Sequence, residues 1–439
     1  MPQIGKRRIS MLLKFSFKNF RSFKDLSCLD LTPANIRDIP YSVLKTKIKK
    51  EYKALSSSII YGANASGKSN VILALAFMRE LVISGNLKNQ RGIPIELIPC
   101  FCDSKNSTID FAIEFIHKNY VFNYKIQIGN VKFLSDESNP IIAGESLFVN
   151  EQHIFERKNK EVSFLEFLKN EDPDALNVIK EKATSSLLDD ELFLTNGYKT
   201  LIDTTIYSTI LNWFQDELII IKNIDFISSV PRFDYEQIGD AAEDKFKLSD
   251  EIINKIAKEA GVNSTEIHFL KSDKDKTPQA FSIIDGKGVV ARFIESAGTM
   301  KMINFLPLAI SAMVKGATLV IDELDSSLHP SAVFSIINAF HNDELNVNKA
   351  QLIFTSHNPI YQKAKIFRRD EIKFIERNKE TSKIYNLSDF GTSGEGQVKN
   401  STDIMKNYLT GKYGAINYID FSEVIADALQ LNGCKGDCE

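Results

Sequence analysis

Cysteine is scarce in this sequence, and tryptophan is nearly absent. Five cysteines occur in 439 residues, an odd number, and Trp213 is the single tryptophan. The cysteines are Cys28, Cys100, Cys102, Cys434 and Cys438. Neither close pair is matched by a second pair at the spacing of a zinc site, so we expect reduced thiols and no cysteine metal site. Trp213 is expected to pack in a core or an interface.

Long apolar runs and an excess of one charge are also missing. No apolar stretch approaches the roughly 20 residues that span a bilayer, and no secretory h-region follows Lys6, Arg7 and Arg8. We therefore expect a cytoplasmic protein with no membrane partner. The net charge of -3 argues against a chain dedicated to coating nucleic acid, although it leaves room for a local basic patch.

What is present is the composition of a folded protein. The chain is 43% hydrophobic and 25% charged, which excludes a disordered chain, and its length exceeds the usual size of one core. We therefore expect two lobes or domains: one built from an amino-terminal part over 1–160 and a carboxyl-terminal part over 286–439, and a mainly helical lobe over 161–285 inserted between them.

One stretch fits the pattern Gly-x-x-x-x-Gly-Lys-Ser of a phosphate loop. An apolar strand over 55–60 leads into it, and an apolar helix over 71–82 follows it, which favours a phosphate loop over an ordinary turn. Backbone N–H groups of such a loop surround a polyphosphate, Lys68 reaches the β and γ phosphates, and Ser69 ligates Mg²⁺. The predicted nucleotide-binding residues are Gly62, Ala63, Asn64, Ala65, Ser66, Gly67, Lys68, Ser69 and Asn70.

The second half of the chain supplies further polar residues at strand ends. The apolar run 317–321 ends in Asp322, which can hold Mg²⁺, and Glu323, which can act as general base on an attacking water. A second strand, 351–355, runs into Ser356 and His357. A histidine there is either structural or close enough to sense a γ-phosphate. Upstream, Ser296 is a candidate helix N-cap, and Gly298 permits close approach of a backbone.

Alternating apolar residues predict β-structure before residue 160. The expected strands are 12–17, 26–31, 109–115, 120–128, 144–149 and 154–157. The lysine-rich run 45–53 is interpreted as a solvated loop, with contact to DNA as the alternative. From 161 to 223 the apolar spacing becomes helical, which predicts the helical lobe, and another helix is expected over 249–260.

Together these stretches resemble the ABC-type ATPases of the branch that includes SMC, RecF and the overcoming-lysogenisation-defect proteins. The segment 19–23 (NFRSF) resembles the amino-terminal motif of that branch, 62–69 resembles Walker A, and 322–323 resembles Walker B. The segment 326–329 resembles the D-loop, and His357 the switch histidine. The signature motif corresponds to 295–299, with Ser296 and Gly298 at matching positions and Thr299 in place of the usual glutamine.

This resemblance implies an α/β fold, an ABC-type ATPase head with a phosphate-loop core in a mixed sheet. It also implies ATP and Mg²⁺ as cofactors, Glu323 and His357 as catalytic residues, and Ser69 and Asp322 as metal ligands. In such proteins the signature of one subunit caps the nucleotide of another, so Ser296, Gly298 and Thr299 would act in trans. Two departures are His329, where an aspartate often closes the D-loop, and the lack of a clear Q-loop glutamine, for which Gln90 is the candidate.

A narrower resemblance extends through the tail. The segments 367–372, 385–390 and 408–416 look like the tail of abortive-infection ATPases of the AbiL and RloA kind, and the ATPase subunits of the Septu and PARIS antiphage systems are similar. Taken one at a time, the three segments predict only an edge strand, a helix start and a glycine-containing turn. The resemblance implies homodimers, or larger assemblies of dimers, that control a separate effector chain, a nuclease.

Other functions remain open on the sequence. A RecF-like DNA repair ATPase would need a DNA-binding surface, for which the run 45–53 is the main candidate. A self-contained nuclease would need a Toprim domain, but only 82 residues follow His357, without the expected carboxylates. A nucleotide-dependent scaffold without turnover is disfavoured by Glu323.

Overall fold

The structure is a computed structural model of the whole chain. It describes residues 9–36, 40–88, 97–100, 108–132, 139–164, 173–222, 250–259, 266–270, 279–326, 328–362, 366–391, 398, 402–417 and 420–433. The strands are β1 (Ser10–Lys18), β2 (Ser27–Asp30), β3 (Val43–Ile48), β4 (Lys50–Leu55), β5 (Ser57–Gly62), β6 (Ile109–His117), β7 (Tyr120–Gly129), β8 (Ile141–Val149), β9 (Gln152–Lys158), β10 (Glu161–Phe164), β11 (Leu218–Ile221), β12 (Glu266–Leu270), β13 (Gln279–Ile284), β14 (Lys287–Val290), β15 (Thr318–Ile321), β16 (Gln351–Thr355), β17 (Ile372–Asn378) and β18 (Thr381–Asn386).

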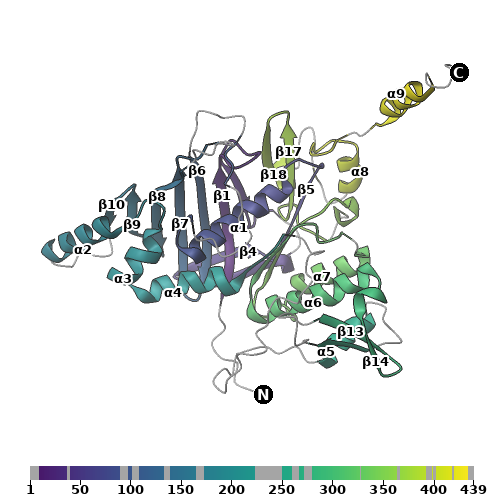
Figure 1. The fold of residues 1–439 in the computed structure, drawn as a ribbon, viewed down its shortest axis with the longest axis horizontal. Helices are drawn as coiled ribbons and strands as arrows, with labels where there is room; N and C mark the ends of the chain where they lie inside the picture. Colours follow the sequence, from purple (N-terminus) through teal and green to yellow (C-terminus); the bar gives the residue numbers. More distant parts are fainter. Residues whose placement is uncertain are drawn as a thin grey trace.

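The α-helices are α1 (Lys68–Ser84), α2 (Pro173–Ser186), α3 (Lys199–Leu201), α4 (Thr204–Asn212), α5 (Asp250–Glu259), α6 (Ala297–Lys315), α7 (Pro330–His341), α8 (Ile404–Leu409) and α9 (Ser422–Gly433). Short π-helical segments adjoin two of these helices. Leu194–Tyr198 comes directly before α3, and Trp213–Glu217 comes directly after α4. Figure 1 shows α9 projecting from the body of the protein at the carboxyl-terminal end.

A six-stranded mixed sheet forms the centre of the fold. Its order is β11-β15-β16-β5-β17-β18, in which the first five strands are parallel and β18 is antiparallel to β17. Every residue of β5, β15 and β16 is buried, as expected for parallel strands covered on both faces. These strands confirm the predicted strands before the phosphate loop, before Asp322 and before Ser356.

A seven-stranded antiparallel sheet forms a second layer, in the order β10-β9-β8-β7-β6-β1-β2. Ile109, Phe111, Ile113 and Phe115 of β6 point inward and are almost fully buried, and the residues between them face outward. The pairings β1 with β2, β6 with β7 and β8 with β9 confirm the three strand pairs predicted from alternation.

Helix α1 lies between the two sheets (Figure 1). One core joins its buried residues, among them Leu75 and Met78, to Phe115 of the antiparallel sheet and Ile353 of the mixed sheet. A second core covers the other face of the mixed sheet with α6, α7 and α8. The phosphate loop is therefore held at the start of a helix that is packed on both sides. Trp213 is fully buried and stacks on Phe115 at 4.0 Å between ring centroids, as expected of a core residue.

The segment 161–285 does not form one helical lobe. Its described residues from Ala183 to Phe214 contribute to the core of the antiparallel sheet, and β11 is an edge strand of the central mixed sheet. Helix α5 confirms the helix expected over 249–260, but β12, β13 and β14 form a separate three-stranded sheet beside it. The expectation of a helical insertion is not confirmed, because periodicity over a short window does not reveal which distant element a helix or strand packs against.

One further expectation is wrong. The run 45–53 is not a loop: β3 and β4 pair antiparallel as a hairpin, with Lys49 at a positive φ of 52° in the turn. Among the described residues, one helix, α6, is long and apolar enough to span a membrane by length and composition, with a mean hydropathy of 1.3. It contributes Phe305 and Leu308 to the second core, so its apolar residues are explained by packing against the sheet.

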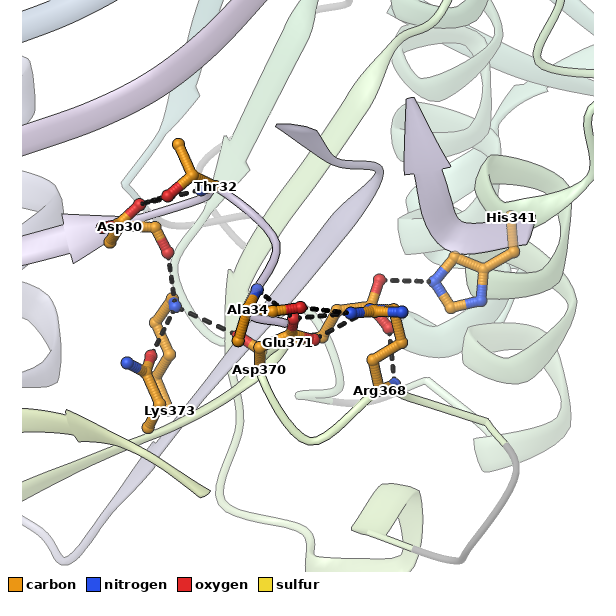
Figure 2. A network of polar contacts seen from close by, with 9 residues as sticks. Asp30, Thr32, Ala34, His341, Arg368, Asp370, Glu371 and Lys373 are labelled. Carbon is orange, nitrogen blue, oxygen red and sulfur yellow. Dashed lines mark hydrogen bonds and ion pairs between the residues drawn. The ribbon is translucent and has the colours of Figure 1, made fainter. Parts of the chain in front are cut away.

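A buried polar network joins three distant segments (Figure 2). Asp370 accepts hydrogen bonds from Arg368 and from the N–H of Ala34. Glu371 accepts from the N–H of Arg368 at 2.7 Å, and its other oxygen lies 3.1 Å from Nε2 of His341 at the end of α7. The tail segment 367–372 is therefore not an edge strand. It leads into β17, which is an inner strand between β5 and β18. The buried charged side chains of this segment are hydrogen-bonded to one another and to their neighbours.

Replacing Glu371 with alanine is expected to destabilise the protein by about 2–4 kcal/mol, because Arg368 N–H, Ser57 and His341 each lose a buried acceptor. Urea unfolding measures the loss. The matched control is Glu380→Ala in the exposed turn between β17 and β18, which should change the free energy of unfolding by less than about 0.5 kcal/mol. Equal effects of the two changes would contradict the structural importance of this network.

Candidate nucleotide site

Three strand ends of the mixed sheet place the candidate residues together. β5, β16 and β15 are parallel neighbours, so their carboxyl ends lie at one edge of the sheet. The phosphate loop follows β5, Asp322 follows β15, and Ser356 and His357 follow β16. Such an edge is the usual ligand site of parallel α/β sheets.

The loop between β5 and α1 has the backbone of an anion cradle. Gly67, the N-cap residue of α1, has a φ of 111° and offers no capping side chain, and the first turn of the helix carries no acidic residue. The N–H of Asn70 in that turn donates to the carbonyl oxygen of Gly67 at 3.0 Å, so the N–H groups of Lys68 and Ser69 are the ones directed to an anion. Nζ of Lys68 donates to the carbonyl oxygens of Gly62 at 2.8 Å and Ala63 at 3.0 Å, which folds the side chain back over the loop.

Serine residues from two other segments hold the loop from behind. Ser382 of β18 donates to the carbonyl oxygen of Ser66 at 2.6 Å, and its Oγ lies 2.8 Å from Oγ of Ser22. Asn70 of α1 donates to the same Ser22 oxygen at 2.9 Å. A Cβ on Gly67 would lie 2.7 Å from that oxygen, so the position requires glycine on steric grounds as well as for its φ. The amino-terminal motif 19–23 thus reaches the site through Ser22.

The two acidic residues after β15 are fixed by Thr355 of the neighbouring strand. The Thr355 hydroxyl donates to Oδ1 of Asp322 at 2.6 Å and accepts the N–H of Glu323 at 2.7 Å. Glu323 has a φ of 53°, an unusual backbone conformation for a glutamate that is typical of functional positions. Its carboxylate is half-exposed and free to meet a ligand, whereas Asp322 is held at the sheet edge.

His357 faces Glu323 across the site. Its Nε2 lies 3.6 Å from Oε1 of Glu323, and both side chains are partly exposed. Partial burial and the nearby positive charge of Lys68 lower the pKa of His357, against the opposing effect of the acidic residues. At neutral pH the imidazole is therefore uncharged and can donate one hydrogen bond and accept another.

These residues fit a Mg²⁺-bound nucleoside triphosphate. The uncapped helix start and Lys68 suit phosphate oxygens, while the exposed hydroxyl of Ser69 and the carboxylate of Asp322 are the hard oxygen ligands that Mg²⁺ prefers. When bound, the metal neutralises charge on the phosphates. Glu323 and His357 are placed to accept and hold a proton from a water molecule that attacks the terminal phosphate held by the loop. The chemistry that the arrangement can perform is phosphoanhydride hydrolysis.

The signature candidates lie elsewhere. Ser296 is the N-cap of α6, and its Oγ accepts the N–H of Thr299 at 3.1 Å, as expected of a cap. Ser296 is exposed, and within the described ranges no recorded contact joins Ser296 or Gly298 to the phosphate loop. Among the described residues, the phosphate loop, the pair Asp322 and Glu323, and His357 come together at one sheet edge, whereas Ser296 and Gly298 make no contact with them.

The D-loop candidate connects these two regions. Nζ of Lys301, on α6, donates to the carbonyl and hydroxyl oxygens of Ser326. His329 is the N-cap of α7: its Nδ1 accepts the N–H of Ser331 at 3.2 Å, which explains how a histidine can stand where an aspartate is usual. Ser327 and the Q-loop candidate Gln90 lie outside the described residues, as do Cys102, Cys434 and Cys438.

Several residues of the site escaped the sequence analysis. Thr355 and Ser382 are ordinary strand residues in the sequence, and nothing local marks them. Arg377, at the end of β17, donates to the carbonyl oxygen of Ala65 at 3.2 Å. Asp325 accepts a hydrogen bond from Ser356 at 2.8 Å, and its burial raises the pKa of its carboxyl group. In the sequence, Asp325 could have been assigned to the site only from its position three residues after Asp322, next to the D-loop candidate.

The sequence profile of the family described as "AAA domain, putative AbiEii toxin, Type IV TA system" matches residues 57–360, more than half of the chain. The chain belongs to this family. The matched region of this AAA domain begins at the first residue of β5 and ends just after His357, so it contains every strand end that forms the site. A comparison with curated proteins gives no match.

Solved structures similar to this AAA domain protein include SMC heads. They are an SmcHead bound to the C-winged helix domain of ScpA (15% identity, 85% of this chain and 97% of that chain, TM-score 0.41), the SMC head domain from Thermotoga maritima (14%, 85% and 98%, 0.38) and the Smc head domain with an extended coiled coil bound to the C-terminal domain of ScpA derived from Pyrococcus furiosus (13%, 86% and 96%, 0.41).

Thr355→Val is expected to lower the turnover number about 10-fold, because Asp322 loses a donor and the N–H of Glu323 loses its acceptor, while the branched side chain still suits the strand. Steady-state ATP hydrolysis measures the change. The control is Thr318→Val on β15, whose hydroxyl contacts Gln351 away from the site and whose loss should leave turnover nearly unchanged. Equal loss in both variants would show that the hydroxyl of Thr355 does not align the acidic residues.

Proposed function

We propose that this chain is the ATP-hydrolysing, ABC-type subunit of an abortive-infection defence system against phage, akin to the AbiL and RloA ATPases. The observation that carries the proposal is the meeting of Lys68, Asp322, Glu323 and His357 at one sheet edge. The family match, whose description names a putative AbiEii toxin, supports the defence setting. ATP with Mg²⁺ is the substrate, and the protein acts in the cytoplasm.

In this proposal, two copies form a sandwich around nucleotide. Ser296, Gly298 and Thr299 of one copy contact the phosphates held by Lys68 of the other, an arrangement supported by the exposure of Ser296 at the start of α6. Hydrolysis through Glu323 opens the sandwich. The hydrogen bond from Lys301 to Ser326 links α6, which begins at the signature candidate, to the loop that follows Asp322 and Glu323. The helix and this loop would therefore move together.

The sandwich, or a larger assembly of such dimers, would control a separate effector chain, a nuclease. The test is co-purification of the chain with the product of its neighbouring gene, for the wild type, Lys68→Ala and Glu323→Gln. We expect Glu323→Gln to trap an oligomer that carries the neighbour, and Lys68→Ala to form none. Glu344→Gln, an exposed loop change, is the matched control and should behave as the wild type. If all four proteins have the same mass and no partner, the effector proposal fails.

A further inference from the structure

The hairpin of β3 and β4, residues 43–55, carries an unusual excess of positive charge; we refer to it as the lysine hairpin. Its single acidic residue is Glu51. Its lysines are Lys45, Lys47, Lys49, Lys50 and Lys53, and all five are exposed. The chain as a whole has a net charge of -3, so this excess is local.

The lysine hairpin is a fixed surface of the fold. Leu44 and Ala54 point inward and pack in a small core with Met11 and Leu13 of β1. Because side chains alternate along a strand, Lys45 and Lys47 point outward, and Lys45 pairs in register with Lys53 on the neighbouring strand. Adjacent outward lysines on one strand are about 7 Å apart, which lets each reach a different phosphate of a nucleic-acid strand.

Among the described residues, two of these five lysines form an ion pair. Lys53 lies 3.2 Å from Glu51, and Lys50 pairs with Glu151. In the part of the chain that the structure describes, no carboxylate lies within 4 Å of the ammonium groups of Lys45, Lys47 or Lys49, although Lys47 stands opposite Glu51 in the hairpin register and the charge of Lys49 acts on Glu151. A sixth lysine, Lys349, donates to the carbonyl oxygen of Lys45 and adds its charge to the same surface.

The lysine hairpin lies far from the phosphate loop. β4 ends at Leu55, immediately before the amino end of β5, whereas the phosphate loop follows the carboxyl end of β5. Lys349 likewise precedes the amino end of β16. A six-residue strand spans about 20 Å, so the two surfaces occupy opposite edges of the mixed sheet.

We propose that the lysine hairpin binds the phosphate backbone of double-stranded DNA without sequence preference and independently of nucleotide. Lysines make compact, hydrated charge contacts with phosphates, and such contacts position a duplex without reading its bases. The aromatic ring of the hairpin, Tyr52, lies under Lys50 at 5.2 Å from its Nζ, so it offers no platform for stacking unpaired bases. This proposal stands apart from ATP hydrolysis and from the effector.

The test is fluorescence anisotropy with a labelled duplex over a series of salt concentrations. We compare the wild type with the triple variant Lys45→Gln, Lys47→Gln and Lys49→Gln. The control is a triple variant with the same loss of charge at other exposed lysines, namely Lys125→Gln, Lys158→Gln and Lys182→Gln. We expect the hairpin variant to bind about 10- to 100-fold more weakly, with the slope of log affinity against log salt reduced by about 2–3, and the control to match the wild type.

Lysines on exposed strands also discourage pairing between sheet edges, so each variant is checked for monodispersity and thermal stability. Replacing the same three lysines with arginine keeps both charge and solubility and should retain binding. Lys68→Ala should bind DNA as the wild type does. The proposal is overturned if the two glutamine variants bind alike, if binding depends on Lys68, or if a single strand, RNA or anionic vesicles are preferred over the duplex.

Discussion

Glu323→Gln is expected to lower the turnover number for ATP by at least about 100-fold, the usual range for loss of a general base. The geometry gives the reason. Glu323 has a half-exposed carboxylate that lies beside His357, at 3.6 Å, while its backbone N–H is fixed by Thr355. Glutamine has the same shape and tolerates the same backbone, but it cannot accept a proton from water. ATP affinity should therefore change by less than about threefold.

Single-turnover hydrolysis and equilibrium binding of ATP together measure these two quantities. Glu344→Gln, in an exposed loop after α7, removes the same charge far from the site and should leave both unchanged. A Glu323→Gln variant that hydrolyses ATP as the wild type does would assign the base elsewhere. Asp325 is then the next candidate, because burial raises the pKa of its carboxyl group.

The phosphate loop was predictable because its requirements are local. Gly67 needs a positive φ, Lys68 must follow it, and the strand and helix on either side are each visible as apolar runs. Asp322 and Glu323 were predictable for the same reason. The convergence of these segments with His357 followed from the rule that parallel strands end at one edge, and it required no knowledge of packing.

The residues that hold the phosphate loop and the acidic pair in place could not be predicted in this way. Ser382 holds the carbonyl of Ser66 although 316 residues separate them, and a serine in an edge strand has no local signature. Thr355 likewise reads as a β-branched strand residue. The same limit explains the segment 161–285: its helical spacing was visible, but the pairing of β11 with β15 depends on contacts between distant parts of the chain.

Lys68→Met is expected to weaken ATP binding by about 100-fold or more. Hydrogen bonds to charged groups contribute about 1.5–3 kcal/mol each, and the ammonium group of Lys68 is the main cation of the loop. Isothermal titration measures the loss. Lys182→Met, an exposed lysine on α2, is the control and should bind ATP normally. Tight binding by the Lys68 variant would show that the loop does not hold the phosphates.

The same change should stabilise the nucleotide-free protein. Burial lowers the pKa of Lys68 to about 8, opposed only in part by Asp322, Glu323 and Asp325. Between pH 8 and the ordinary value of 10.5, the unfolded chain binds this proton and the folded protein does not, so the stability of the wild type rises with pH in that window. Below pH 8 the folded protein bears the full penalty of a buried charge.

Lys68→Met removes that penalty. Its free energy of unfolding should exceed that of the wild type by about 1–2 kcal/mol at pH 7, after allowance for partial solvation, and the difference should shrink as pH rises from 8 to 10. Denaturant unfolding at several pH values measures this difference. A difference that is independent of pH would mean that the pKa of Lys68 is ordinary. A destabilised variant would mean that the hydrogen bonds from Lys68 to Gly62 and Ala63 contribute more to the free energy of unfolding than burial of the charge removes. The charged lysine would then stabilise the loop even without nucleotide.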